Sequence, residues 1–237
     1  MLTISLVIPA YNEEKFLARC LDEVRRHSDT RFKEIIVVNN GSTDSTAVIA
    51  ARYPEVTLVE ESRRGTGWAR ERGWRTATGD IIAFIDADTR LPNGWVERVL
   101  QSFAADPKLV CLSGPYSYYD LAWFPRLLSK IYLVLAWLTY HATGYLAIFG
   151  NTAVRRHTLE QMNGINTSIL FYGDDTDLAR RASKFGRVKF DFKLVMPTSA
   201  RRFRSHGLFR TGWLYTINFF AEVLWHRPTT AGLDDIR

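Results

Sequence analysis

The sequence GDIIAFIDADT at residues 79–89 joins a continuously apolar run to two aspartates. The run Ile81–Ile85 predicts a strand buried on both faces, and Asp86 and Asp88 follow where that strand ends. Carboxylate oxygens are hard ligands that suit Mg²⁺ or Mn²⁺, and these ions commonly bind substrate phosphates as well. The spacing therefore indicates a metal site at a sheet edge. A turn in which an aspartate caps a helix starting near Pro92 explains the same residues and stays open.

Four more short apolar runs surround this strand and alternate with amphipathic stretches. They cover residues 2–8, 34–38, 56–60 and 110–112. Strands that alternate with helices through short links form β-α-β units, which predicts an α/β fold with a Rossmann-like, mostly parallel sheet flanked by helices. Ligands of such sheets bind at the carboxyl ends of the strands, so the segments that follow these strands should meet at one rim.

A helix is expected between the first two strands. Apolar residues recur at helical spacing from Phe16 to Val24, and Asn12 is placed to cap this helix, with two acids in its first turn. The regular alternation of strands and helices breaks near 114–116, after which aromatic residues and arginines are more frequent. A C-terminal half that is helical and rich in aromatic residues is therefore expected.

The composition bounds the class of protein. The chain has 237 residues, 46% of them hydrophobic and 24% charged, which suffices for one sizeable core but not for two. A formal net charge of +6 favours anionic partners such as nucleotide phosphates, nucleic acid or an acidic membrane surface. Two cysteines, Cys20 and Cys111, cannot form a disulfide framework, and the start MLTISLVIPAYNEE lacks a basic leader. A cytoplasmic protein with buried thiols is expected.

Four segments, taken in series, resemble the family 2 glycosyltransferases. They are SLVIPAYNEE (5–14), VVNNGSTDST (37–46), GTGWARERGWRTATGDIIAFIDADT (65–89) and GDDTDLARR (173–181). The resemblance covers roughly residues 3–205. It implies a GT-A fold and the transfer of a sugar from a nucleotide-diphosphate sugar to an acceptor, with inversion at the anomeric carbon and with Mn²⁺ or Mg²⁺ as cofactor.

The resemblance also implies which residues bind the donor. In this family the loop after the first strand lies against the nucleotide base and ribose, which assigns that role to Pro9, Ala10, Tyr11 and Glu13. Many relatives carry aspartate where this chain has Asn39-Asn40, and Asn40 is the candidate for contact with the base. Because an amide can both donate and accept, guanine or thymine stays open beside uracil. An Asx turn that leads into the next helix explains the same run without a ligand.

The metal and its neighbourhood follow from the same resemblance. Asp88 is expected to coordinate the ion, with Asp86 beside it and nearer the ribose. Arg70 stands where the family's Ala-Arg-Asn segment has its arginine, but Glu71 replaces the asparagine. The dipeptide Gly-Asn at 150–151 resembles the acceptor-side Gly-X-Asn-X-Ala segment of the family.

Two late segments complete the expected site. Asp174-Asp175 falls where the family usually has Glu-Asp, and the second position is the usual base, so Asp175 is the candidate base and Asp174 its catalytic neighbour. Acids in the first turn of a helix also meet the helix dipole favourably, which explains them structurally. In the run ARRFR at 200–204, a guanidinium is expected to steady the departing diphosphate, and Arg202 is the candidate. Solvated surface charge accounts for any single one of these arginines equally well.

Residues 131–149 form an apolar stretch that approaches a transmembrane helix in length. One crossing here would leave the acids at 86 and 88 and those at 174 and 175 on opposite sides of a bilayer, so a buried core helix, an in-plane helix or a hairpin dipping into one leaflet is expected instead. Residues 208–225 add an aromatic helical face with basic neighbours, which is typical of membrane surfaces and also of core or dimer packing. The hypothesis is peripheral contact with the cytoplasmic face of a membrane and a sugar or a polyprenyl- or other lipid-linked acceptor.

The predicted organisation is one domain with an appendage. Residues 1–205 form the GT-A domain, with a nucleotide-binding half over about 1–113 and an acceptor half over about 114–205 that includes an apolar helical segment at 123–149. Residues 206–237 form a C-terminal amphipathic helix and tail.

Two other functions remain open. A nucleotidyltransferase has a similar sheet and acidic metal site, but its glycine-rich loop should follow the first strand, where this chain has PAYNEE (9–14). A catalytically silent module that binds nucleotide sugars or anionic lipids would not need the two acidic pairs. Nucleic acid is not an expected partner, because the basic residues form no compact stripe. The GTG at 65–67 lacks the third glycine and the position of a dinucleotide-binding motif.

Overall fold

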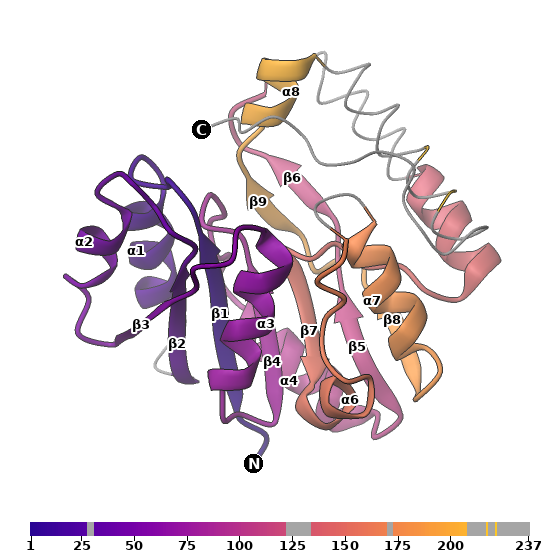
Figure 1. The fold of residues 1–237 in the computed structure, drawn as a ribbon. Coiled ribbons are helices and arrows are strands. Elements are labelled where there is room, and N and C mark those ends of the chain that lie inside the picture. Colours follow the sequence, from indigo (N-terminus) through magenta and orange to yellow (C-terminus); the bar gives the residue numbers. More distant parts are fainter. Residues whose placement is uncertain (28–30, 122–133, 170–172, 208–216, 218–220, 222–237) are drawn as a thin grey trace.

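The computed structural model of this chain describes residues 1–27, 31–121, 134–169, 173–207, 217 and 221. A central sheet carries helices on both faces, and a smaller two-stranded sheet stands beyond its upper edge (Figure 1). The strands are β1 (Ile4–Ala10), β2 (Phe32–Asn39), β3 (Val56–Glu60), β4 (Ile81–Ile85), β5 (Leu109–Ser113), β6 (Tyr116–Tyr118), β7 (Asn151–Arg155), β8 (Arg187–Phe190) and β9 (Met196–Thr198). The helices are α1 (Leu17–His27), α2 (Thr46–Ala50), α3 (Thr66–Thr76), α4 (Trp95–Ala105), α6 (Arg156–Gln161), α7 (Asp174–Ala182) and α8 (Arg201–His206), and residues 134–143 are also helical.

The central sheet has the strand order β3-β2-β1-β4-β7-β5-β8, and β6 pairs with β9 in the second sheet. β1 runs parallel to both β2 and β4, β2 runs parallel to β3, and β5 runs parallel to β8. This confirms the predicted α/β fold with a mostly parallel sheet. The second half was predicted to be helical, but it also contains β6, β7, β8 and β9, none of which was predicted. β7 runs antiparallel to both of its neighbours, β4 and β5.

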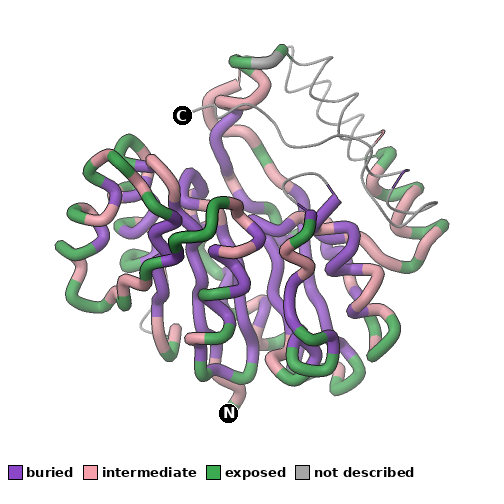
Figure 2. Tube along the Cα trace, viewed as in Figure 1, coloured by how far each residue is buried: buried purple, intermediate pink, exposed green. Residues whose placement is uncertain are grey.

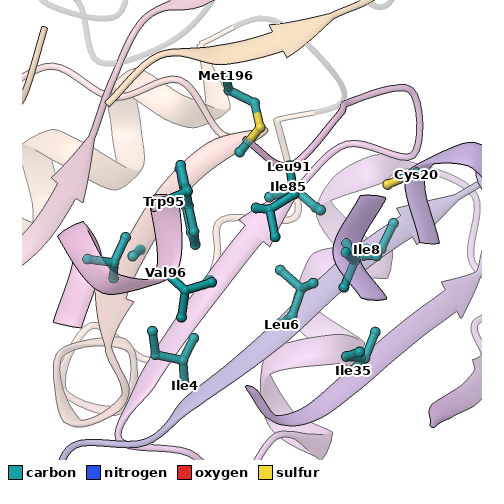
Figure 3. Packing of buried hydrophobic residues seen from close by; sticks show 14 of the residues in the cluster. Ile4, Leu6, Ile8, Cys20, Ile35, Ile85, Leu91, Trp95, Val96 and Met196 are labelled. Atoms are coloured by element: carbon teal, nitrogen blue, oxygen red, sulfur yellow. The ribbon is translucent and has the colours of Figure 1, made fainter. Parts of the chain in front are cut away.

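Both faces of the sheet are buried, as the continuous apolar runs require. Ile4, Leu6 and Ile8 of β1 pack on one face with Trp95 and Val96 of α4 (Figure 3). The opposite face is covered by α3, α6 and α7, and the buried strands between the two layers are visible in Figure 2. The two cysteines are buried as predicted, and burial raises the pKa of each thiol to about 12.

The carboxyl ends of β1, β2 and β4 meet at one rim. Ala10 stands opposite Asn39 in the register of β1 and β2, and Val7 stands opposite Phe84 in that of β1 and β4. The segments that follow β1 and β2 are joined by a hydrogen bond from the Glu13 N–H to Thr46 Oγ1 at 2.7 Å, and those that follow β1 and β4 are joined by Arg201, which binds Glu13 and Asp88. The segments that carry the candidate residues therefore converge as the parallel topology predicted.

The prediction that Asn12 caps the first helix is wrong. α1 begins at Leu17, with no acidic residue in its first turn, and it buries Leu17 and Val24 on the predicted face. Asn12 instead takes a positive φ of 52° and accepts a hydrogen bond from the Thr43 N–H at 2.8 Å. Its side chain is thus used to join the loops after β1 and β2, and this long-range contact outweighs the local capping signal.

The apolar stretch is described only in part. Within the described residues, no helix combines the length and the apolarity needed to cross a bilayer. Residues 134–143 are helical and expose Val134, Leu135, Trp137 and Leu138, so a buried core helix is the wrong interpretation for this part. The predicted segment 208–225 lies outside the described residues, apart from positions 217 and 221.

Asn151 joins three parts of the fold instead of facing an acceptor. This side chain is fully buried at the start of β7. Its Oδ1 accepts from Trp95 Nε1 at 2.8 Å, and its Nδ2 donates to the Leu194 carbonyl at 2.6 Å. The resemblance of this segment to an acceptor-binding motif therefore does not carry over to the Asn151 side chain, which is fully buried and bound to Trp95 and Leu194.

Replacing Asn151 with alanine should lower the free energy of unfolding by about 2–4 kcal/mol, because the Trp95 indole N–H and the Leu194 carbonyl would stay buried without partners. Urea denaturation of the two proteins measures this difference. Exposed Asn93 offers the control, since Asn93→Ala should change stability by less than about 0.5 kcal/mol. Equal stability losses in the two variants would contradict the assigned role.

Candidate active site

Arg70 of α3 connects the two acidic segments. Its guanidinium donates from Nη1 to Asp174 Oδ2 at 2.7 Å and from Nη2 to Asp86 Oδ1 at 3.1 Å. The guanidinium also lies over the Phe149 ring, 4.1 Å from its centroid, and Arg70 is only 6% exposed. The acids after β4 and those at the start of α7 therefore share one site, although 104 residues of sequence separate Arg70 from Asp174.

Asp86 is held from both sides. Its second oxygen accepts a hydrogen bond from the Tyr116 hydroxyl at 2.8 Å. Gly150 lies against Asp86 and Tyr116, and a side chain at this position would collide with both. Burial acts to raise the pKa of Asp86, but the charges of Arg70 and Arg202 and the Tyr116 hydroxyl outweigh it and hold the pKa below its usual value. Asp86 is therefore ionised at neutral pH.

Asp88 is more deeply buried, with 8% of its surface exposed. Its Oδ1 accepts from Thr198 Oγ1 at 3.2 Å, and its Oδ2 lies 3.0 Å from Arg201 Nε. Burial raises the pKa of Asp88 to about 6, Arg201 opposes that rise, and the neighbouring charges of Asp86 and Glu13 add to it. The alternative that an aspartate here caps a helix is wrong, because α4 begins at Trp95 without a side-chain cap.

The loop after β1 reaches the same place. Pro9 and Ala10 are buried residues of β1, whereas Tyr11 is half-buried and has the Arg64 guanidinium 4.1 Å from its ring centroid. Glu13 is 4% exposed, and its two oxygens accept from Arg201 Nη1 and Nη2 at 2.7 and 2.6 Å. Arg201 thereby joins the loop after β1 to Asp88.

The contacts of Asn39 and Asn40 favour the structural interpretation of this run. Asn39 Oδ1 accepts from the Ser42 N–H at 3.1 Å, which is the geometry of an Asx turn. The Asn40 amide donates both of its hydrogens, to the carbonyls of Glu61 and Arg63 at 3.0 and 2.7 Å, and its oxygen accepts from the Gly65 N–H at 2.9 Å. As placed, the Asn40 side chain fastens the loop after β3 and has no hydrogen left to donate to a base.

The acidic residues at the start of α7 differ in their contacts. As predicted, Asp174, Asp175 and Asp177 lie in the first turn of this helix. Both oxygens of Asp174 are engaged, one by Arg70 and the other by the Asp175 N–H at 3.0 Å. Asp175 Oδ1 accepts from the Thr176 N–H at 2.8 Å, and burial together with the charge of Asp174 raises the pKa of Asp175 to about 7.

The arginines of α8 also differ from one another. Arg202 is half-buried, and its charge acts on the carboxyl groups of Asp86 and Asp88. Arg204 lies elsewhere, paired with Asp120 at 2.7 Å, and more than half of its side chain is exposed. Arg201 contacts Glu13 and Asp88 directly, although Arg202 was the residue selected from the sequence.

Sequence reasoning missed three further residues of the site. Tyr116 and Thr198 donate to the two aspartates after β4, and Phe149 lies beneath Arg70. The break in the strand and helix alternation near 114–116 was a signal for the first of these. Phe149 stands directly before the Gly-Asn pair at 150–151, and Thr198 precedes the run ARRFR at 200–204, but neither motif pointed to these two side chains.

The donor set fits a divalent cation that is shared with a substrate. Among the described residues, no three His, Cys, Asp or Glu side chains form a complete metal site. Mg²⁺ and Mn²⁺ sites often use one or two carboxylates together with water and substrate phosphates, and Asp86 and Asp88 can supply those two. In this structure the guanidinium of Arg201 occupies one side of the Asp88 carboxylate.

Comparisons with known proteins agree with this architecture. The fold and the rim of acids define a GT-A type α/β protein. The model of the glycosyl transferase family 2 matches residues 5–163, so the chain belongs to this family. The glycosyltransferase AglE of Haloferax volcanii is 35% identical over 101 residues, which make up 40% of this chain and 33% of that protein. The dolichyl-phosphate beta-glucosyltransferase ALG5D of Trichomonas vaginalis is 39% identical over 97 residues, 36% of this chain and 30% of that protein.

Solved structures show the same fold. The mannosyltransferase PcManGT of Pyrobaculum calidifontis, solved with GDP-Man and Mn²⁺, matches with a TM-score of 0.76 at 23% identity over 94% of this chain and 64% of that one. The glucosyl-3-phosphoglycerate synthase of Mycobacterium tuberculosis, solved with Mn²⁺, UDP and phosphoglyceric acid, gives a TM-score of 0.68 at 20% identity over 98% and 82%. The chain spans about a third of the length of the two curated relatives.

Proposed function

We propose that this chain transfers a sugar from a nucleotide-diphosphate sugar to an acceptor in a metal-dependent, inverting reaction. The observation that carries the proposal is the bridge from Asp86 through Arg70 to Asp174, because it sets a pair of candidate cation ligands against a pair of candidate catalytic acids. Family membership and the neighbours solved with GDP-Man or UDP and Mn²⁺ support the same reaction.

Asp88 and Asp86 are the proposed ligands of Mn²⁺ or Mg²⁺. When bound, such a cation neutralises the charge that grows on the departing diphosphate. Tyr116 and Thr198 orient the two carboxylates by donating to one oxygen of each, which leaves the ligand geometry fixed before substrate arrives. Arg202 is the proposed contact for the diphosphate, since its charge already acts on both aspartates.

Asp175 is the proposed general base. Asp174 has both oxygens engaged and therefore serves to position its neighbour and Arg70, not to take a proton. A base works best when its pKa lies near the working pH, and the pKa of Asp175 is raised to about 7. Asp175 would remove the proton of an acceptor hydroxyl as that oxygen attacks the anomeric carbon. Where the acceptor is a phosphate, no base is required and Asp175 would position it.

The loop after β1 disfavours the nucleotidyltransferase alternative. A triphosphate would need a glycine-rich loop with free backbone N–H groups at this place. The chain has PAYNEE (9–14) there, and the N–H of Glu13 is already donated to Thr46. We further propose that residues 1–205 act as one unit, because β7, β8 and α7 of the second half complete the sheet and the site of the first.

Nucleotide sugars should stabilise the protein more strongly with Mn²⁺ than without it. At a concentration about a hundred times the dissociation constant, the cognate donor should add about 2.7 kcal/mol, which raises Tm by about 5–10 °C for a chain of this size. A thermal-shift screen of GDP- and UDP-sugars, with and without Mn²⁺, measures this. Asp88→Asn should remove the additional shift that Mn²⁺ gives, whereas Asp22→Asn, an exposed change on α1, should retain it. Equal shifts without Mn²⁺ and in Asp88→Asn would refute the metal role.

Transfer should increase as the pH rises through about 7, because Asp175 must be a carboxylate to accept the proton and its pKa is raised to about 7. The pH dependence of kcat/KM, measured with the donor found in the screen, tests this. Asp175→Asn should reduce kcat by about 10²–10⁴-fold and remove the acidic limb while leaving the donor-induced thermal shift intact. A variant that keeps the same limb would show that another group is the base.

We also propose peripheral contact with a membrane that presents a lipid-linked acceptor. The support is the apolar face of residues 134–143, where Val134, Leu135, Trp137 and Leu138 are each about half exposed. Tryptophan and leucine side chains of this kind favour the membrane interface. The relative ALG5D, named for dolichyl phosphate, is consistent with such an acceptor.

Replacing Leu135 and Trp137 together with serine should weaken sedimentation with anionic phosphatidylglycerol vesicles by about tenfold or more, because each apolar side chain contributes about 1.5–3 kcal/mol when buried. Phe185→Ser is the matched control, since Phe185 is 45% exposed and lies outside this segment. Vesicle binding that is equally strong in both variants, or absent from the wild-type protein, would contradict this proposal.

A further inference from the structure

The positively charged guanidinium of Arg201 lies directly beside Asp88. Its Nε lies 3.0 Å from Asp88 Oδ2, while Nη1 and Nη2 bind the two oxygens of Glu13 at 2.7 and 2.6 Å. The side chain of Arg201 is only 15% exposed, and its guanidinium lies 4.9 Å from the centroid of the Phe16 ring. One arginine thus neutralises two buried carboxylates that belong to the loops after β1 and β4.

A divalent cation cannot simply be added to this arrangement. Asp88 Oδ1 accepts from Thr198, and Oδ2 is paired with Arg201, so a cation that binds Asp88 meets the guanidinium at the same carboxylate. Like charges repel strongly where little water separates them. The cation and Arg201 therefore compete for Asp88.

The diphosphate of a donor offers Arg201 another partner. Guanidinium groups form paired hydrogen bonds with phosphate oxygens as readily as with carboxylates. The backbone before α8 is anchored, because Asp120 accepts from the Ser199 hydroxyl at 2.8 Å and from the Ala200 N–H at 2.6 Å. A change of partner by Arg201 is thus a rotation of its side chain and does not require α8 to move.

We infer that Arg201 couples the binding of the cation to the binding of the nucleotide. It holds Asp88 in place of the cation until a diphosphate draws its guanidinium away, and Asp88 then becomes available to the ion. This inference rests on the proposed function, since it takes a nucleotide diphosphate as the ligand. Coupling of this kind is reciprocal, so each ligand raises the affinity of the other by the same factor, typically about 5–150-fold.

Mn²⁺ titration followed by electron paramagnetic resonance tests the inference without any measurement of activity. Free Mn²⁺ is counted with the full chain alone, with UDP and with GDP. In the wild-type protein, one of these nucleotides should tighten Mn²⁺ binding by about 5-fold or more. In Arg201→Gln, Mn²⁺ alone should bind about tenfold more tightly than to the wild-type protein, and the effect of the nucleotide on that affinity should largely disappear.

Arg204→Gln is the matched control, because Arg204 lies on the same helix and pairs with Asp120 instead of the site. It should leave both the Mn²⁺ affinity and the coupling unchanged. If Arg201→Gln fails to fold, as judged by circular dichroism, Arg201→Met replaces it. A methionine fills similar space but carries no charge, so Mn²⁺ alone should again bind more tightly than to the wild-type protein.

Folded Arg201 variants that bind Mn²⁺ alone no more tightly than the wild-type protein would overturn the inference. A nucleotide that binds the wild-type protein without changing its Mn²⁺ affinity would overturn it as well. Failure of the proposed function has a different signature, in which neither UDP nor GDP binds the wild-type protein at any Mn²⁺ concentration. The comparison of Mn²⁺ affinities in the absence of nucleotide still decides the role of Arg201 in that case.

Discussion

The site depends on the cost of gathering carboxylates where little water reaches them. Glu13, Asp88 and Asp174 are each less than a tenth exposed, and Asp86 lies among them. Such a group is unstable unless cations balance it, and removing one partner from a buried ion pair typically costs about 3–5 kcal/mol. Arg70 and Arg201 supply the balance by binding two carboxylates each. The two arginines are therefore as important to the architecture of the site as the acids themselves.

The fold brings these charges together through the direction of its strands. β1 and β4 are parallel neighbours, so the loops that carry Glu13 and Asp88 leave the sheet on the same side. β7 runs in the opposite direction and begins at this rim, which lets the small residue Gly150 lie against Asp86. The polar groups at the rim are thus fixed by a core that is apolar on both faces of the sheet, and this rigidity keeps the carboxylates close despite their repulsion.

Local patterns predicted those parts of the protein that local interactions determine. The apolar runs at 34–38 and 81–85 are strands because their side chains are buried on both faces, and the acids at 174–177 begin a helix that they also stabilise. The antiparallel strand β7, the shift of Asn12 from a cap to a link between loops, and the pairing of Arg201 with Glu13 across 188 residues were not predictable in this way. Each of these features depends on partners that are distant in sequence. The spacing of residues along a single sequence does not reveal such partners.

The two arginines also explain why the aspartates after β4 need not be equivalent. Asp86 binds Arg70 and the Tyr116 hydroxyl, and together with Arg202 these partners hold its pKa below the usual value. Asp88 is more buried, and burial raises its pKa to about 6 although Arg201 opposes the rise. Each arginine joins one of these aspartates to a second acid, since Arg70 also binds Asp174 and packs on Phe149, and Arg201 also binds Glu13 and packs on Phe16. The difference between the two aspartates therefore comes from the deeper burial of Asp88 and from the charges of Asp86 and Glu13 beside it.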